Sequence, residues 1–78
     1  MPVETVKIND RGSTGFVLAA GQARAIADEG GCAKIHYTND PKATQAAYVW
    51  KRGDEYVIET ATLIEPDWLN RLRHAVVI

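Results

Sequence analysis

The sequence has 78 residues, and a chain of this length is expected to form one domain spanning residues 1–78. Nine Lys and Arg against ten Asp and Glu give a formal net charge of −1, which argues against a dedicated duplex-DNA binder and equally against a strongly acidic DNA mimic. Because so small a domain buries only about 60–65% of the surface of its unfolded chain, it needs a thin core or a partner subunit, and a homodimer stays open.

The beginning of the chain predicts a β-hairpin. Residues 3–8 alternate, with Val6 and Ile8 on one face, which indicates a first strand. Residues 9–15 are almost all turn formers. We therefore expect the chain to reverse there and to return as a short second strand over residues 16–18.

The next segment predicts a helix followed by a strand. Residues 19–29 are rich in alanine and suit a helix. Gly30-Gly31 predicts its end, because glycine accepts the left-handed conformation of a helix C-cap. Its apolar face is shallow and consists of Ala19, Ala23, Ile26 and Ala27. Residues 32–38 alternate again and predict a strand, with His36 and Lys34 on the face opposite Ile35 and Tyr37.

The second half of the chain predicts a hairpin and a final helix. Residues 39–42 are expected to form a loop, followed by a hairpin over residues 47–59 that continues to residue 64. Pro66 and Asp67 predict a helix start, and an apolar stripe follows at helical spacing (Trp68, Leu69, Leu72, Ala75 and Val76). The last residues, from Ala75, are β-prone and are expected to leave the helix for a strand. The predicted order is β-β-α-β-β-β-α, an α+β domain with a small, mostly antiparallel β-sheet and two helices on one face.

The loop of the hairpin decides which of its residues share a face. We expect a three-residue loop over residues 51–53, because Gly53 then sits where a left-handed residue is needed. This register places Tyr48, Trp50, Tyr56 and Ile58 on one apolar face, and Val49 with Val57 on a mixed one. In one interpretation the apolar face is the sheet's half of the core, covered by Trp68 and Leu72. In the other, Trp50 stays partly exposed and forms a contact patch.

Two charged surfaces are candidate sites for a partner. The aromatic and basic one combines the hairpin tip with the last helix, because Trp, Tyr and Arg dominate interface hot spots; it consists of Tyr48, Trp50, Lys51, Arg52, Arg71 and Arg73. The rival acidic surface could imitate phosphates toward a basic channel and consists of Asp40, Asp54, Glu55, Glu59 and Glu65. For both sets of residues the alternative to a partner-binding site is an ordinary solvent-exposed surface.

No residue pattern predicts chemistry. The segment Gly12-Ser-Thr-Gly15 lacks the Gly-Lys-Ser/Thr ending of a phosphate-binding loop, and the two histidines, His36 and His74, do not have metal-ligand spacing. Cys32 is the single cysteine, so it is either a small buried side chain or half of an intermolecular disulfide. We therefore expect no enzyme, no metal and no cofactor. The sequence shows neither an apolar run of about 18 residues nor a signal peptide, so we expect a cytoplasmic protein without a membrane partner.

The opening of the chain resembles proteins of phages and gene-transfer agents. The resemblance rests on Val6-Lys-Ile-Asn-Asp and Gly15-Phe-Val17, a short basic strand, a polar loop and a Gly-aromatic-Val step. A stand-alone domain without catalytic groups is also similar to the inhibitor proteins of mobile elements, including anti-CRISPR proteins. The resemblance implies a bacterial host and a protein partner, a CRISPR effector or another host nucleoprotein complex, which the domain would block sterically. A nucleic-acid-binding hairpin and a structural subunit of a phage-like particle remain the alternatives.

Overall fold

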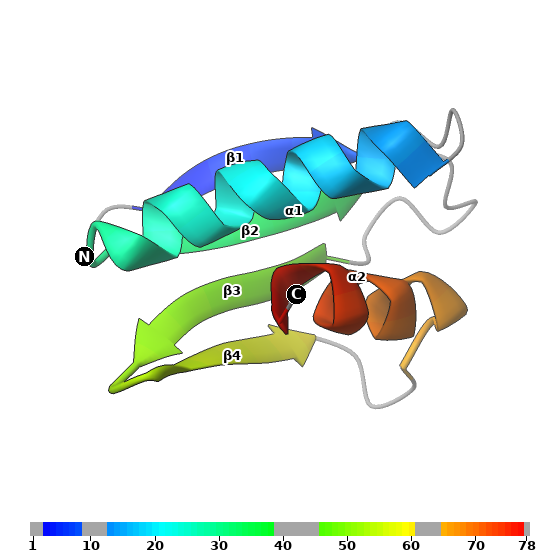
Figure 1. Ribbon diagram of the computed structural model, residues 1–78. Coiled ribbons are helices and arrows are strands. Elements are labelled where there is room, and N and C mark those ends of the chain that lie inside the picture. Colours follow the sequence, from blue (N-terminus) through cyan, green and yellow to red (C-terminus); the bar gives the residue numbers. More distant parts are fainter. Residues whose placement is uncertain (1–2, 9–12, 39–45, 61–64, 78) are drawn as a thin grey trace.

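The described residues form one mixed sheet of four strands, and two helices pack on the same face of it (Figure 1). The computed structural model describes residues 3–8, 13–38, 46–60 and 65–77. The elements follow the order β1 (Val3–Ile8), α1 (Ser13–Asp28), β2 (Cys32–Tyr37), β3 (Ala46–Arg52), β4 (Glu55–Thr60) and α2 (Asp67–Val77). The expected α+β class with helices on one face is confirmed, whereas the expected order contained one strand too many.

The strand predicted over residues 16–18 is wrong, because these residues belong to α1. Phe16 starts a row of buried residues at helical spacing that continues through Ala19, Ala20, Ala23, Ile26 and Ala27. Burial of that row outweighs the strand preference of three consecutive apolar residues. Consequently β1 and β2 are parallel neighbours, with Val6 opposite Ile35, and α1 is the crossover that a parallel pair requires. Of the predicted turn, residues 9–12 lie outside the described residues.

The predicted end of the first helix is confirmed. Gly30 has φ 84°, its amide donates to the Ala27 carbonyl at 3.0 Å, and the Gly31 amide donates to the Ile26 carbonyl at 2.9 Å. These two bonds form a Schellman motif, which satisfies carbonyls that the helix leaves free. The chain turns sharply there and enters β2 beside β1.

The predicted three-residue loop of the hairpin is also wrong. Arg52 pairs with Glu55, so only Gly53 and Asp54 form the turn. Gly53 has φ 63° and Asp54 has no positive φ, which is the arrangement of a type II′ turn with glycine at its first central position. The even turn shifts the register by one residue and moves each side chain of one strand to the other face relative to its partner strand.

The final helix begins where Pro66 and Asp67 predict it, and the Leu69 amide donates to the Pro66 carbonyl at 3.0 Å. The predicted stripe is confirmed, with Trp68, Leu69, Leu72 and Val76 buried and Ala75 half-buried against them. The expected strand at the end of the chain is wrong, since the helix continues to Val77. Burial of Val76 keeps this β-prone segment helical.

The core lies between the helices and one face of the sheet, which we call the helix face. Alternate residues of the strands face the helices. Ile8, Ile35 and Val49 among them are fully buried, whereas Glu4 and Lys51 near the ends of their strands are exposed. At one end Trp68 stacks on Tyr37 with ring centroids 5.4 Å apart, and Phe16 packs against Tyr37 at 6.0 Å. Tyr56 and Ile58 border the same cluster. The three-residue loop would place Tyr48 and Trp50 on the same face as Tyr56 and Ile58. In the structure the two pairs lie on opposite faces of the sheet.

Candidate functional site

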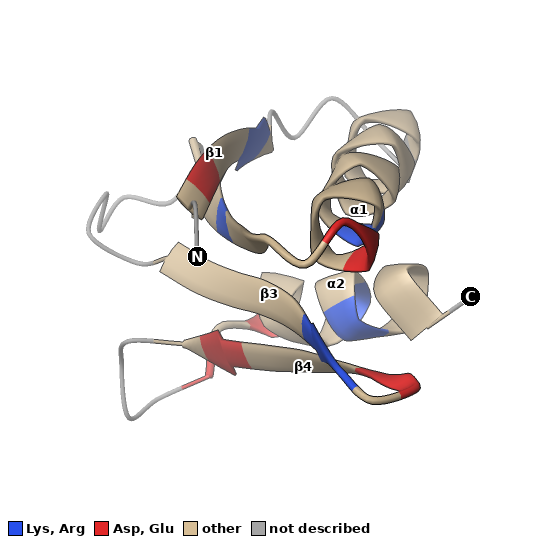
Figure 2. Ribbon diagram, turned by 90° about the vertical axis from the view of Figure 1, so that its left-hand side faces the viewer, with Lys and Arg blue, Asp and Glu red and all other residues tan. Residues whose placement is uncertain are grey.

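The candidate site is the opposite side of the sheet, which we call the open face. None of the described helices covers it, because α1 and α2 both lie on the other side (Figure 2). The pairing register and the alternation along each strand place thirteen residues on it: Val3, Thr5 and Lys7 of β1; Cys32, Lys34 and His36 of β2; Ala46, Tyr48, Trp50 and Arg52 of β3; and Glu55, Val57 and Glu59 of β4.

The centre of the open face is apolar and aromatic. Tyr48 and Trp50 follow each other on this side of β3, and Val57 lies directly opposite Trp50 on β4. All three side chains are half-buried. Ala46 continues the row and is buried, although it is not part of the core under the helices. Large aromatic side chains held by a sheet but still reachable are typical of binding surfaces, because they bring much apolar area at little entropic cost.

The two margins of the open face carry opposite charges. Lys7 on β1 pairs with His36 on β2, and Lys34 lies two residues before His36 on the same side. The other margin is β4, which contributes Glu55 and Glu59, and Figure 2 shows the acidic segments of β4. Arg52 stands directly opposite Glu55. The open face is therefore polarised across the strands, basic toward β1 and acidic toward β4.

The predicted basic surface is divided by the sheet. Tyr48, Trp50 and Arg52 lie on the open face, but Lys51 points to the helix face. There its ammonium group is 3.3 Å from Asp28 Oδ1, and Tyr56 donates to the same oxygen at 2.6 Å. The Tyr56 hydrogen bond, followed by that of Lys51, lowers the pKa of Asp28 below its usual 3.8, while partial desolvation opposes the shift. Lys51 thus ties the hairpin to the end of α1.

The two arginines of α2 also lie on the helix side and do not join the hairpin tip in one patch. Arg73 binds Glu65 through two nitrogens at 2.7 and 2.6 Å. This pairing lowers the pKa of Glu65 and raises that of Arg73. Arg71 lies over the Phe16 ring, with 4.0 Å between its guanidinium carbon and the ring centroid, and so connects α2 with α1.

The predicted acidic surface is dispersed as well. Asp40 lies outside the described residues, Asp54 is in the exposed turn, and Glu65 is held by Arg73. Among the described members of the set, Glu55 and Glu59 share one surface, the acidic margin of the open face. They lie beside the aromatics of the other predicted set, so the open face combines parts of both sets.

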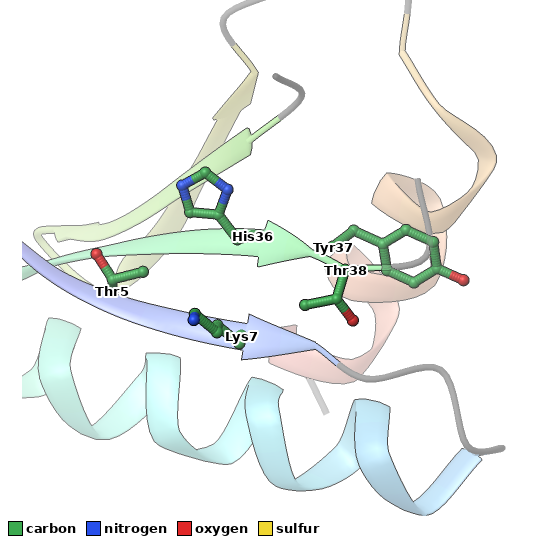
Figure 3. Close-up of a pocket in the computed structure, with 5 residues that line it drawn as sticks. All are labelled: Thr5, Lys7, His36, Tyr37 and Thr38. Atoms are coloured by element: carbon green, nitrogen blue, oxygen red, sulfur yellow. The ribbon is translucent and has the colours of Figure 1, made fainter. Parts of the chain in front are cut away.

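Residues of β1 and β2 are the part of the site that the sequence analysis missed. Figure 3 shows a hollow lined by Thr5, Lys7, His36, Tyr37 and Thr38, in which Lys7 and His36 come from neighbouring strands. The Thr38 hydroxyl donates to the Ile8 carbonyl at 2.9 Å and fixes the end of β2 to β1. The alternation of residues 32–38 had grouped His36 with Lys34, but it carried no information on which strands would lie beside them.

The open face also carries the one cysteine of the chain. Cys32 is a free, half-buried thiol at its border. Among the described residues, no three His, Cys, Asp or Glu side chains gather in a way that could hold a metal ion. Within the same residues, neither helix has the length and apolar character needed to cross a membrane.

Comparisons with known proteins place the chain in no family. No protein-family model matches it, and no curated protein and no solved structure is significantly similar to it.

Proposed function

We propose that this chain is a non-enzymatic protein-binding module and that the open face is its contact surface. The observation that carries the proposal is the position of Tyr48 and Trp50, half-buried on the side of the sheet that no described helix covers. A protein that left such an aromatic row permanently in water would lose the stability that burial gives. Charges of both signs at the margins can orient a partner and exclude others.

The finer part of the proposal concerns the target. We infer a larger host nucleoprotein complex, such as a CRISPR effector, that the module blocks sterically. What supports this is the combination of a very small domain, a formal net charge of −1 and the resemblance of the opening segment to proteins of mobile elements. A standard interface takes about 800 Å² from each partner, so the face would need neighbouring loops or the hairpin tip to reach that size.

The test is capture of the target by tagged protein from host lysate, with and without nuclease, using wild type and Trp50→Ala. We expect a protein band that survives nuclease and is lost with Trp50→Ala. The matched control is Val17→Ser, which changes an apolar side chain that is 62% exposed on α1, away from the open face. A band retained by Trp50→Ala, or lost equally with Val17→Ser, would contradict the assignment of the surface; circular dichroism checks that both variants fold.

A second candidate function is binding of single-stranded nucleic acid on the same face. Lys34 lies directly opposite Tyr48 across β2 and β3, and an aromatic ring beside a cation can stack on an unpaired base while the cation meets phosphate. This function requires affinity for an oligonucleotide that falls steeply with salt. The carboxylates of Glu55 and Glu59 on the same face would repel the phosphates and so count against this function. Fluorescence anisotropy with a labelled single-stranded oligonucleotide at low salt tests this function. If no binding is measured at low salt, the function is rejected.

A further inference from the structure

The polarity of the open face follows one row of residues across the sheet. Lys34 on β2 is opposite Tyr48 on β3, and Tyr48 is opposite Glu59 on β4. Lys34 and Glu59 are therefore at the same level, one strand to either side of Tyr48. Since neighbouring strands are about 4.8 Å apart, their backbones are about 10 Å from each other. Within the described residues neither side chain forms an ion pair.

This arrangement is self-complementary. A twofold axis that runs parallel to β3, just above its open side, maps the open face onto a second sheet facing it. The rotation keeps each residue at its level along the strand and exchanges the two sides, so β2 of one copy lies over β4 of the other. Lys34 then meets Glu59 of the second copy, and this contact occurs twice. Tyr48 and Trp50 meet their own counterparts at the axis.

We propose that the open face is occupied by a second copy of this chain, packed sheet to sheet about this axis. The proposal rests on the proposed function, in that it names a partner for the same protein-binding face. A dimer of this kind covers the apolar centre of the face and places Lys34 of the basic margin against Glu59 of the acidic one. Packed sheets align within about 30° and lie about 10 Å apart, which leaves room for interdigitating aromatic side chains.

A nucleic acid or a uniformly charged protein would fit less well. Either would satisfy one margin and be repelled by the other, because Lys34 and Glu59 flank the aromatic row symmetrically. Like charges brought together at an interface cost several kcal/mol. The occupant must carry an apolar row with a positive charge on one side of it and a negative charge at the same distance on the other side. A second copy of the chain has this pattern by symmetry.

The size of the face sets the strength of the dimer. Only β2, β3 and β4 lie over strands of the second copy. Three strands of about six residues, at about 3.3 Å per residue and about 4.8 Å apart, cover about 300 Å² in projection. This is below the roughly 800 Å² per partner of a standard interface. The dimer is therefore weak and concentration-dependent, and a target that binds the same face more tightly displaces the second copy.

The proposal is tested by sedimentation velocity of the full chain from micromolar to millimolar concentration. We expect wild type to pass from monomer to dimer. Lys34→Glu and Glu59→Lys should each weaken self-association about tenfold or more, because each creates two like-charge contacts across the axis. A mixture of the two variants should form a dimer, since Glu at position 34 of one then faces Lys at position 59 of the other. That recovery separates an interface effect from a folding defect.

The matched control is Lys7→Glu, which makes the same change of charge on the open face. Lys7 is on β1, two strands from β3, where no strand of the second copy lies over it, so we expect its dimer to be as stable as that of wild type. Wild type that stays monomeric at millimolar concentration overturns the inference and leaves the proposed function standing if Trp50→Ala still abolishes capture of a target. A dimer unaffected by Lys34→Glu and Glu59→Lys, or weakened as much by Lys7→Glu as by them, overturns the axis. A dimer weakened as expected, without any target captured through Trp50, confirms the second copy and refutes the target.

Discussion

Two valines of the hairpin give the sharpest test of the two faces of the sheet. Val49 on β3 is fully buried on the helix face, and Val57 on β4 is half-buried on the open face. Val→Ala removes two carbon atoms, about 0.8 kcal/mol each in transfer free energy, and a fixed cavity adds a similar amount. We expect Val49→Ala to lower the free energy of unfolding by about 2–3 kcal/mol. Val57→Ala should lower it by about 1 kcal/mol or less, the scale of strand propensity and cross-strand pairing.

The measurement is urea unfolding followed by circular dichroism, at a protein concentration low enough to keep the open face free. A chain of 78 residues has a total stability of about 4–12 kcal/mol. A loss of 2–3 kcal/mol in Val49→Ala therefore moves the midpoint clearly and lowers Tm by roughly 10–20 °C. A three-residue loop would place both valines on the same face. Equal losses in the two variants would refute the register.

The remaining predictions concern the turn and the two ion pairs. Gly53→Ala should destabilise by about 1–2 kcal/mol in the same urea assay because φ is 63° there, and Gly53→Asn should cost less. An NMR titration should find the pKa of Asp28 below 3.8, and Tyr56→Phe should raise it, since Tyr56 is the main cause of the shift; an unchanged value would contradict that cause. In the folded chain the pKa values of Asp28 and Glu65 lie below their usual 3.8 and 4.5. The stability that their ion pairs contribute is therefore complete above these usual pKa values, and it is lost as the pH falls through the lower pKa values of the folded state. Arg73→Gln should weaken this acid dependence by removing the partner of Glu65, and an unaltered stability profile below pH 4.5 would count against it.

The first helix shows how two local signals competed in the sequence. Residues 12–15 contain two glycines and two hydroxyl side chains, which suggest a turn, and Phe16, Val17 and Leu18 look like a short strand. The helical spacing of buried residues nevertheless begins at Phe16, and it could have been extended back from the alanine row. The parallel pairing of β1 with β2 depends on this helix. A hairpin and a crossover place the same first strand in different parts of the sheet.

The hairpin was located correctly, but the side chains of its two strands were assigned to common faces in the wrong register. Segregation of apolar side chains favoured the three-residue loop, because Tyr48, Trp50, Tyr56 and Ile58 would then share one face. That criterion assumes that one face is buried and the other is wet. Here the open face is itself apolar at its centre, so segregation is incomplete and the geometry of Gly53 decides the register instead. The departure from the simple pattern falls on the surface that we propose to be functional.

The candidate site was predicted in part for the same reason. Tyr48, Trp50 and Arg52 were identified by residue type, and they do lie on the open face. Lys51 and Arg73 have the same chemistry but are engaged by Asp28 and Glu65. Whether a surface cation is held by a carboxylate depends on contacts between elements distant in the sequence, and alternation within one strand does not contain them.

Binding of a partner to the open face also raises the free energy of unfolding of the chain. A partner that binds the folded chain and not the unfolded one adds RT ln(1 + [L]/Kd), about 2.7 kcal/mol at a hundred times Kd. That is a large share of the roughly 4–12 kcal/mol expected for a chain of this length. Substitutions under the helices, such as at Val49, act on the isolated chain and therefore at every concentration. Substitutions of Lys34 or Glu59 act only where the face is covered, so their effect on stability grows with the concentration of the partner. This dependence on concentration is what separates a binding surface from an ordinary exposed face of a sheet.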